Sequence, residues 1–305
     1  MKTRTVTLSS PEALASLLMI LPAFAVLALF RYSPAISAIW HSLFSWDGFT
    51  SGEFVGMDNY RKLLSDPVMA ASSLNIGQYI AIRTTLNLLF PLLAAELIFH
   101  LGPGRGQSAY KAIFCVPLVV PLMVVLLMWK FIYDAHDGLL NSLLRLAGLS
   151  GVTRDWLGGF DSALYAISGL GFPWVTGIGI AGFGMLLYLA GLQGIPGELF
   201  DACVMDGARG MRRFLSLELP FLSRPLLLVA LLTIINTLQS FVPVMVLTQG
   251  GPGIASMVPG LYLYRNAFGY DHFGYACAIG VLMASVLVAL ALLYTRLESR
   301  AEEAR

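Results

Sequence analysis

Long stretches without charge are the feature that most constrains this chain. No Asp, Glu, Lys or Arg occurs between Asp161 and Glu198, between Arg224 and Arg265, or between Asp271 and Arg296. A helix needs about 20 apolar residues to cross the hydrocarbon core of a bilayer. Each of the three intervals is long enough to hold such a helix, so the sequence predicts membrane-spanning helices rather than a soluble domain.

The same criterion predicts six spans and therefore an all-α integral membrane protein with a single domain over residues 1–305. The composition agrees, since 57% of the residues are hydrophobic and only 12% are charged, against about 25% charged in soluble domains. The second span contains Arg83 and Glu96, whose roles the sequence leaves open. The expected spans are residues 14–30, 78–101, 112–129, 163–192, 225–248 and 273–295.

The basic residues between the spans predict their orientation. Lys and Arg number 11 in the segments 1–13, 101–111, 193–224 and 296–305. They number 7 in the segments 31–74, 130–160 and 250–272, although this second set is longer. Because cytoplasmic loops carry the excess of basic residues, the first set is assigned to the cytoplasm. Both termini are then expected to be cytoplasmic.

Residues 194–220 form the charged interruption of the apolar C-terminal half and are expected to be a cytoplasmic docking loop. Pro196 suits a first helical turn, and Glu198 and Asp201 lie where a helix dipole favours acids. Gly207 is placed to end that helix in the left-handed conformation. At helical spacing the apolar face of this helix would consist of Leu199, Phe200, Cys203 and Val204.

The arginines of this loop have two interpretations. Arg209, Arg212 and Arg213 follow the predicted helix closely. They could contact a docked partner or lipid headgroups at the rim of the loop, or they could simply be the positive charge that keeps a loop in the cytoplasm. Both interpretations remain open from the sequence.

Motifs for enzymatic chemistry are absent from the sequence. No G-x-x-x-x-G-K-[ST] phosphate-binding loop, H-E-x-x-H or G-x-S-x-G occurs, and the three cysteines and four histidines are widely spaced. A G-x-G-x-x-G string at residues 177–182 lies inside an uncharged stretch, which favours close packing of helices over nucleotide binding. We therefore expect neither catalytic residues, nor a metal, nor a cofactor in this chain, and the net charge of +1 gives no reason to expect nucleic acid.

Polar side chains within the expected spans are candidates for a substrate path, because such groups are costly in hydrocarbon unless they face protein or water. Uncharged hydroxyls and amides can hydrogen-bond the hydroxyls of a sugar without a counter-charge. Hydrogen bonding between helices is an equally good explanation. The candidates are Asn87 in the second span and Thr233, Asn236, Gln239 and Ser240 in the fifth.

The docking loop resembles the "EAA" loop of ABC importer permeases, whose pattern ends in I-x-L-P. Asp201-Ala202-Cys203, Asp206-Gly207-Ala208 and Leu217-Glu218-Leu219-Pro220 stand at the three parts of the pattern, with Asp for Glu, Cys for Ala and Leu for Ile. The resemblance implies that this loop couples the chain to an ATPase. The coupling residues would be Glu198, Leu199, Phe200, Asp201, Ala202, Cys203, Val204, Asp206, Gly207, Ala208 and Arg209.

Further stretches are similar to the maltose-type, carbohydrate-uptake branch of these permeases, and to its F-type subunit in particular. One departure is Phe241-Val242, where such subunits often have Phe-Asp, so the substrate cannot be taken from the resemblance. The similar stretches are residues 54–60 (F-x-G-x-x-N-Y), 138–141 with 156–157 (G-x-x-N and W-L), 189–196 (L-A-G-L-Q-x-I-P), 248–252 (T-x-G-G-P) and 264–268 (Y-x-x-A-F).

The resemblance implies a type I ABC importer permease in a bacterial cytoplasmic membrane. It implies a heterodimer with a second permease subunit, two ATPase subunits that bind MgATP, and an extracytoplasmic solute-binding protein. The solute would be a sugar or a sugar-like compound, with a polyol or a glycerol-phosphate as the alternative; a carrier or channel without ATPases is the other class. The residues expected to contact the binding protein are Gln249, Gly250, Gly251 and Pro252.

Overall fold

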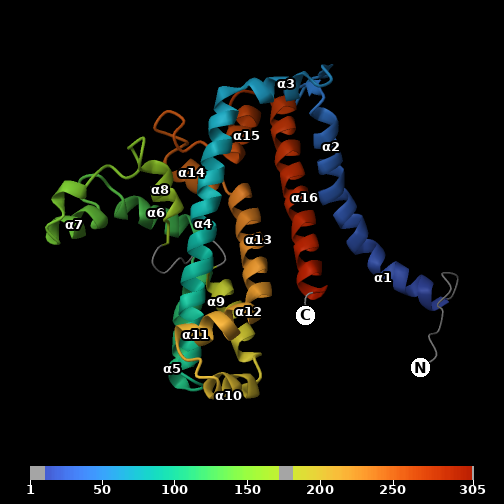
Figure 1. Cartoon of the computed structure of the whole chain (residues 1–305). Coiled ribbons are helices and arrows are strands. Elements are labelled where there is room, and N and C mark those ends of the chain that lie inside the picture. Colours follow the sequence, from blue (N-terminus) through green and yellow to red (C-terminus); the bar gives the residue numbers. More distant parts are fainter. Residues whose placement is uncertain (1–10, 172–180, 304–305) are drawn as a thin grey trace. The chain divides into compact units, whose positions relative to one another are not determined.

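The computed structural model describes residues 11–171 and 181–303, and these residues are mostly helical (Figure 1). The chain divides into two compact units, one of residues 1–65 with 263–282 and the other of residues 66–262 with 283–305. The prediction of an all-α fold is confirmed. The one departure in the described residues is a pair of two-residue strands.

The smaller unit begins with a helix that does not end where the sequence analysis expected. The helices α1 (Pro11–Leu27) and α2 (Ser33–His41) are joined by the π-helical turn η1 (Ala28–Tyr32). Residues Leu18–His41 are apolar enough to cross a membrane, with Arg31 as their one charged residue. A single arginine ends a charge-free stretch but does not end a helix, so the helix continues well past residue 30.

A short ribbon follows, and the N-Y part of the F-x-G-x-x-N-Y motif holds it in place. Strands β1 (Phe44–Ser45) and β2 (Glu53–Phe54) pair antiparallel. Asn59, in α3 (Asp58–Ser65), donates to the carbonyls of Ser42 and Phe44 at 2.8 and 2.9 Å. The Tyr60 hydroxyl lies 2.7 Å from Ser42 Oγ. These two residues therefore have a structural role in this unit.

The larger unit is a bundle built around one long helix, α4 (Pro67–His100). Asp66 begins this helix by accepting from the amides of Val68 and Met69, at 2.8 and 3.4 Å, and Pro67 occupies the first helical position. The other elements, in chain order, are α5 (Arg105–Cys115), η2 (Val116–Val119), α6 (Leu122–Ile132), α7 (Leu139–Leu146), η3 (Ser150–Val152), α8 (Ala163–Ser168), α9 (Ala181–Gln193), α10 (Gly197–Met205), α11 (Met211–Arg213), η4 (Phe214–Glu218), α12 (Leu219–Phe221), α13 (Ser223–Gln239) and α14 (Val242–Leu247). The helices α15 (Pro259–Phe268) and α16 (Phe273–Glu303) each contribute to both units.

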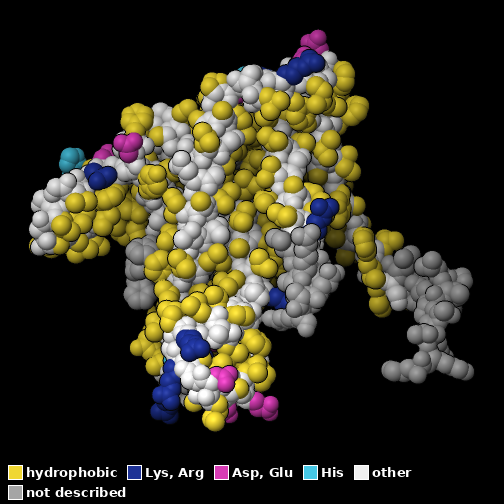
Figure 2. Space-filling model, in the orientation of Figure 1, with side chains coloured by type: hydrophobic (Ala, Val, Ile, Leu, Met, Phe, Trp, Pro, Cys, Tyr) yellow, Lys and Arg dark blue, Asp and Glu magenta, His cyan; other side chains and the backbone are white. Residues whose placement is uncertain are grey.

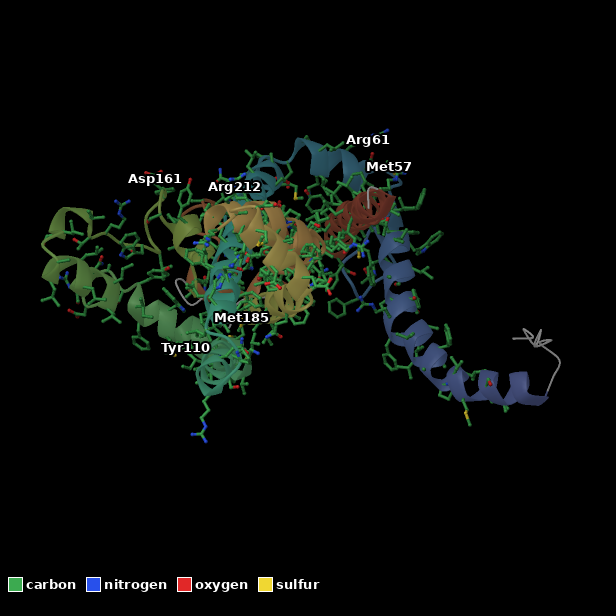
Figure 3. All side chains as sticks on the ribbon, turned by 60° about the horizontal axis from the view of Figure 1, so that its bottom comes forward. Met57, Arg61, Tyr110, Asp161, Met185 and Arg212 are labelled. Atoms are coloured by element: carbon green, nitrogen blue, oxygen red, sulfur yellow. The ribbon has the colours of Figure 1, made fainter. Side chains whose placement is uncertain are left out.

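The core of this bundle forms where α4, α9 and α13 pack together. Ala95 of α4, Met185 and Tyr188 of α9 and Val229 of α13 are fully buried in one cluster. Met185 points into the packed interior in Figure 3, whereas Tyr110 of α5 points outward. Apolar surface on the outside of the bundle is also extensive, as the space-filling view shows, and charged side chains gather at the end that carries α10 (Figure 2). This distribution suits a bundle immersed in lipid, with its charged end in water.

Two of the expected spans are interrupted by proline. Arg105–Val119 and Leu122–Ile132 meet at 94°, within the expected span 112–129. The expected span 225–248 is divided between α13 and α14, because Pro243 has no amide to donate to the carbonyl four residues earlier. Among the described residues, three helices are long and apolar enough to cross a membrane, Leu18–His41, Pro67–His100 and Phe273–Arg296. The number rises to five if two bent pairs each count as one span, namely Arg105–Val119 with Leu122–Ile132 and Met211–Phe221 with Ser223–Gln239, which meet at 67°.

The expected fourth span, 163–192, and the glycine string at 177–182 lie partly outside the described residues. Gly182 is described, and a Cβ atom there would lie 3.0 Å from the Phe114 carbonyl oxygen and from a methyl group of Leu118. α9 and the α5–η2 segment therefore approach closely at Gly182. This contact agrees with the packing interpretation of that part of the string.

The G-x-x-N and W-L motifs bring together two stretches that are separate in sequence. Asn141, on α7 and fully buried, accepts from Trp156 Nε1 at 2.8 Å and donates to the carbonyls of Ala135 and Arg154 at 3.0 and 2.9 Å. Nearby, the amides of Asp137 and His136 donate to the Asp134 carboxylate and lower its pKa. The G-x-x-N and W-L residues therefore hold the loop between α6 and α8 in one shape.

Candidate coupling loop and transport path

The predicted docking helix is α10, at the lower end of the larger unit in Figure 1. Its C-terminus has the expected cap. Gly207 has φ +70°, its amide bonds the Val204 carbonyl at 3.1 Å, and the amide of Ala208 bonds the Cys203 carbonyl at 2.8 Å. These two bonds are the Schellman pair, so the prediction of a left-handed glycine at this position is confirmed. The helix ends at Met205, directly before this cap.

Two residues of the predicted apolar face of α10 pack against the chain's own core, and the other two are exposed. Phe200 and Cys203 are partly buried against the chain's own core, with the Phe200 ring 5.8 Å from that of Phe99 on α4. Leu199 and Val204 at the edges of this face are 37% and 47% exposed, and Met205 on the opposite side is 86% exposed. Phe200 and Cys203 therefore cover the core of their own chain, and Leu199 and Val204 are the more exposed residues of the predicted face.

The side of α10 that faces away from the core combines Met205 with charged and small residues. Glu198, Asp201, Ala202 and Asp206 are all exposed. Beyond the cap, Ala208 is buried and Arg209 is exposed. An acidic and methionine-bearing surface of this kind can dock a partner through one apolar anchor and a polar rim.

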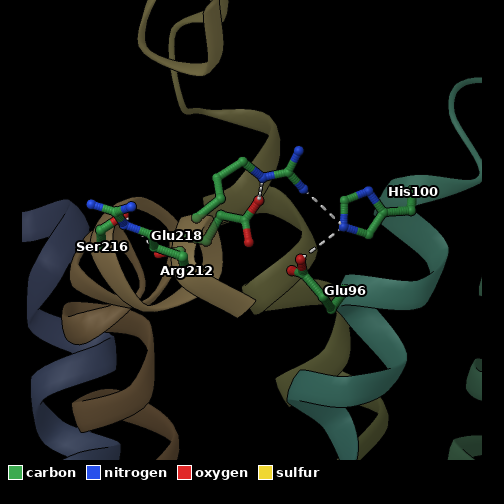
Figure 4. A network of polar contacts seen from close by, with 6 residues as sticks. Glu96, His100, Arg212, Ser216 and Glu218 are labelled. Carbon is green, nitrogen blue, oxygen red and sulfur yellow. Dashed lines mark hydrogen bonds and ion pairs between the residues drawn. The ribbon is translucent and has the colours of Figure 1, made fainter. Parts of the chain in front are cut away.

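Polar side chains connect this loop to the end of α4 (Figure 4). His100 Nε2 lies 3.0 Å from Glu96 Oε1 and 3.1 Å from Arg213 Nη2, and Arg213 Nε donates to Glu218 Oε1 at 2.8 Å. Glu96 thus contacts His100 and not Arg83, which donates to the Leu170 carbonyl at 2.8 Å instead. This group was not predicted from the sequence, although the four-residue spacing of Glu96 and His100 places them on one helix face.

The candidates for the substrate path separate into buried and exposed sets. Asn87 and Thr233 are 1% exposed, and Asn87 Nδ2 lies 3.5 Å from Thr233 Oγ1, at the limit of a hydrogen bond between α4 and α13. Ser240 is partly buried at the end of α13. Asn236 and Gln239 are exposed on α13, and Asn236 Nδ2 donates to the Leu232 carbonyl of its own helix at 2.8 Å. The helix-packing interpretation therefore fits the first pair, and the exposed pair is available to a solute.

The turn after α14 holds the residues expected to contact a binding protein. Gln249, Gly250 and Gly253 have φ of +50°, +81° and +56°. The buried Ser256 fixes the turn, because its hydroxyl donates to the Gly251 carbonyl at 2.7 Å and lies 2.7 Å from Thr248 Oγ1.

The same turn is attached to α4. Asn75 Nδ2 donates to the carbonyls of Ile254 and Met257 at 3.0 and 2.9 Å, and Tyr262 donates to Asp66 at 2.6 Å. α4 therefore carries this turn at one end and the polar group beside the docking loop at the other. We call it the outer turn, after the side of the membrane on which the basic residues predict it to lie. Gln249 and Ile254 remain exposed.

These features define a permease, and comparison with known proteins identifies its family. Residues 87–303 match the model of the binding-protein-dependent transport system inner membrane component, a span that covers the C-terminal part of α4 and all elements from α5 to α16. The chain belongs to this family. The resemblance of the docking loop to that of ABC importer permeases therefore reflects membership of the family.

Individual relatives cover nearly the whole chain. The trehalose/maltose transport system permease protein MalF of Thermococcus litoralis is 33% identical, over 93% of this chain and 94% of the relative. The diacetylchitobiose uptake system permease protein NgcF of Streptomyces coelicolor is also 33% identical, over 88% and 78%. A solved bacterial ABC transporter involved in the import of the acidic polysaccharide alginate matches with a TM-score of 0.78 at 20% identity, over 95% of this chain and 96% of that chain. The predicted importer-permease fold is thereby confirmed.

Proposed function

We propose that this chain is the transmembrane subunit of an ABC importer that carries a sugar or sugar-like solute into the cytoplasm. The observation that carries this proposal is the family match over residues 87–303, together with relatives named for trehalose, maltose and diacetylchitobiose. A polyol or a glycerol-phosphate is the alternative solute. A carrier or channel that works without ATPases is the alternative mechanism.

The energy for transport would come from two separate ATPase subunits that bind MgATP. The absence of a phosphate-binding motif from this sequence supports a division of labour between chains. Closure of the ATPases would move α10 through the exposed Met205, Leu199 and Val204, with Glu198 and Asp201 at the rim. The bundle would then alternate between inward-open and outward-open states, whose populations shift only through differential binding of ATP and solute.

The solute path would run along the exposed side of α13. Asn236 and Gln239 present amide groups there, and a second, different permease subunit would supply the opposite wall. Amides donate and accept hydrogen bonds with sugar hydroxyls without favouring a charged solute. On the outer side, a solute-binding protein would dock against the turn at Gln249 and Ile254, which is already fixed in shape by Ser256.

The experiment that tests this proposal is reconstitution of the chain in proteoliposomes with the ATPase, second permease and binding protein encoded beside it. Uptake of the sugar bound by that binding protein is expected only with ATP inside the vesicle and binding protein outside. Uptake that persists without the ATPase would support the carrier or channel. If that binding protein holds a polyol or a glycerol-phosphate, this compound replaces the sugar as the proposed solute.

The two exposed amides can be tested in the same system. Asn236→Ala and Gln239→Ala are expected to weaken transport by about 1 kcal/mol each, roughly fivefold, through lost hydrogen bonds to the solute. ATP hydrolysis in the absence of solute should stay unchanged. Thr237→Ala, which removes a neighbouring hydroxyl that is buried in the bundle, is the matched control for altered packing of α13. Normal transport kinetics in both amide variants would place the path elsewhere.

A further inference from the structure

Glu218 is a charged side chain in an unusual position. It lies in η4, after the docking helix, and has no exposed surface. A buried carboxylate is costly unless a charge or hydrogen bonds compensate it. Arg213 Nε supplies this compensation at 2.8 Å from Oε1. The other oxygen, Oε2, has no hydrogen-bond partner among the described residues, so the carboxylate depends on Arg213.

Arg213 contacts two other elements with the same guanidinium. Its Nη2 lies 3.1 Å from His100 Nε2 on α4, and its central carbon lies 5.4 Å from the centre of the Phe200 ring on α10. A guanidinium presents several donors in one rigid plane, so it can hold partners on different elements in a fixed arrangement. One side chain therefore links the docking helix, η4 and the end of α4.

The same place has the donor groups of a metal site. The ligand atoms of Glu96, His100 and Glu218 lie within 4.8 Å of one another. The Arg213 guanidinium stands among them, bonded to one carboxylate and beside the imidazole nitrogen. The positive charge that the buried Glu218 carboxylate requires is thus supplied by Arg213.

We propose that Arg213 is a positioning residue that makes α10 and the cytoplasmic end of α4 move as one body. The inference rests on the proposed function, since it says how the motion received by α10 reaches the rest of the chain. α4 continues from His100 to Asn75 and Asp66, whose hydrogen bonds hold the outer turn. Movement of the docking helix would thereby reach the side where a binding protein docks.

The test is the amount of solute imported per ATP hydrolysed, measured on the complete importer in proteoliposomes. His100→Ala removes the contact with α4 and leaves the ion pair between Arg213 and Glu218 in place. This variant is expected to import about three- to tenfold less solute per ATP, which corresponds to about 0.7–1.4 kcal/mol of coupling and lies within the usual range for residues that couple distant sites. Arg213→Ala removes all three contacts and should reduce the ratio further.

Arg212→Ala is the matched control. Arg212 precedes Arg213, has the same charge, is exposed, and its side chain makes no hydrogen bond or ion pair with the described residues. Solute per ATP should stay within about twofold of the wild type in this variant. Arg213→Ala leaves the buried Glu218 unpaired and could prevent assembly, and in that case His100→Ala decides the question.

The outcomes separate this inference from the proposed function. A wild-type complex that shows no ATP-driven uptake would overturn the proposed function. A wild-type complex that is coupled, with His100→Ala importing as much solute per ATP, would overturn only the role of Arg213. Equal losses in His100→Ala and Arg212→Ala would also overturn it, because the effect would then follow positive charge and not the contact with α4.

Discussion

Two interruptions of the apolar C-terminal half use glycine in opposite ways. In the docking loop, Gly207 has a left-handed backbone at φ +70°, and a Cβ atom there would meet nothing within 4 Å. In the outer turn, Gly250 has φ +81°, and a Cβ atom would lie 2.6 Å from the methyl group and 3.0 Å from the sulfur of Met257. The first glycine is required by backbone geometry alone, and the second by geometry and packing.

The docking loop and the outer turn also differ in how their serine hydroxyls are bonded. The Ser256 hydroxyl is fully buried and joins two parts of the outer turn. The Ser216 hydroxyl is exposed and only donates to the Arg212 carbonyl of its own turn, at 2.8 Å. The hydrogen bonds that shape the outer turn are therefore made within this chain. The docking loop has exposed apolar and acidic residues that a second protein would have to cover.

The largest effect is expected from valine at the two glycines. Positive φ costs a β-branched residue about 1–3 kcal/mol at both positions. At Gly250 the displacement of the buried Met257 adds about 1–3 kcal/mol of overpacking. Thermal unfolding in detergent should therefore show Gly250→Val clearly less stable than Gly207→Val.

Measurements of uptake and ATP hydrolysis test whether Gly207 also matters for coupling. Gly207→Val should still assemble but import less solute per ATP, because the end of the docking helix is altered. Gly207→Asn is its control, since asparagine tolerates the left-handed region. Equal stability of the two valine variants would refute the distinction between the glycines. A normal amount of solute imported per ATP in Gly207→Val would contradict the role of this loop in transmitting motion from the ATPase.

A smaller effect is expected from alanine at the two serines. Ser256→Ala leaves the partly buried Gly251 carbonyl without its hydroxyl donor and the Thr248 hydroxyl without one of its two partners, at a cost of about 1–3 kcal/mol. Ser216→Ala changes an exposed position and should alter the free energy of unfolding by less than about 0.5 kcal/mol. Denaturation of both variants measures the difference. A Ser216→Ala variant as unstable as Ser256→Ala would mean that the docking loop is as rigidly built as the turn.

The sequence predicted the features that depend on local backbone chemistry. The charge-free stretches predicted helices, and the position of Gly207 predicted a left-handed cap, because both follow from neighbouring residues alone. Helix breaks were harder to place. The bend of 94° after Val119 depends on two nearby prolines in a stretch that is otherwise apolar throughout, and apolar composition does not distinguish one long helix from two short ones.

Features that depend on long-range contacts were not predictable. The apolar spacing of Phe200 and Cys203 indicated a buried face, but the sequence could not say whether its own chain or a partner covers that face. Arg213 stood beside Arg212 with the same charge, and only the fold brings it to His100, 113 residues away in the chain. For the same reason, Asn87 and Thr233 were equally good candidates for a solute path until α4 and α13 were seen to pack together.

The smallest effect on stability is expected when glutamate replaces two exposed apolar residues. These substitutions should nevertheless have the most selective effect on partner binding. Met205 is 86% exposed on the docking helix, and Ile254 is 40% exposed on the outer turn. Neither Met205→Glu nor Ile254→Glu should change the free energy of unfolding by more than about 0.5 kcal/mol, because both side chains already contact solvent. Loss of an apolar interface anchor costs about 1–2 kcal/mol of binding, roughly five- to thirtyfold. Met205→Glu should therefore weaken co-purification of the ATPase and leave binding of the solute-binding protein intact, whereas Ile254→Glu should do the reverse. The same loss in both variants would mean that the two surfaces do not serve separate partners.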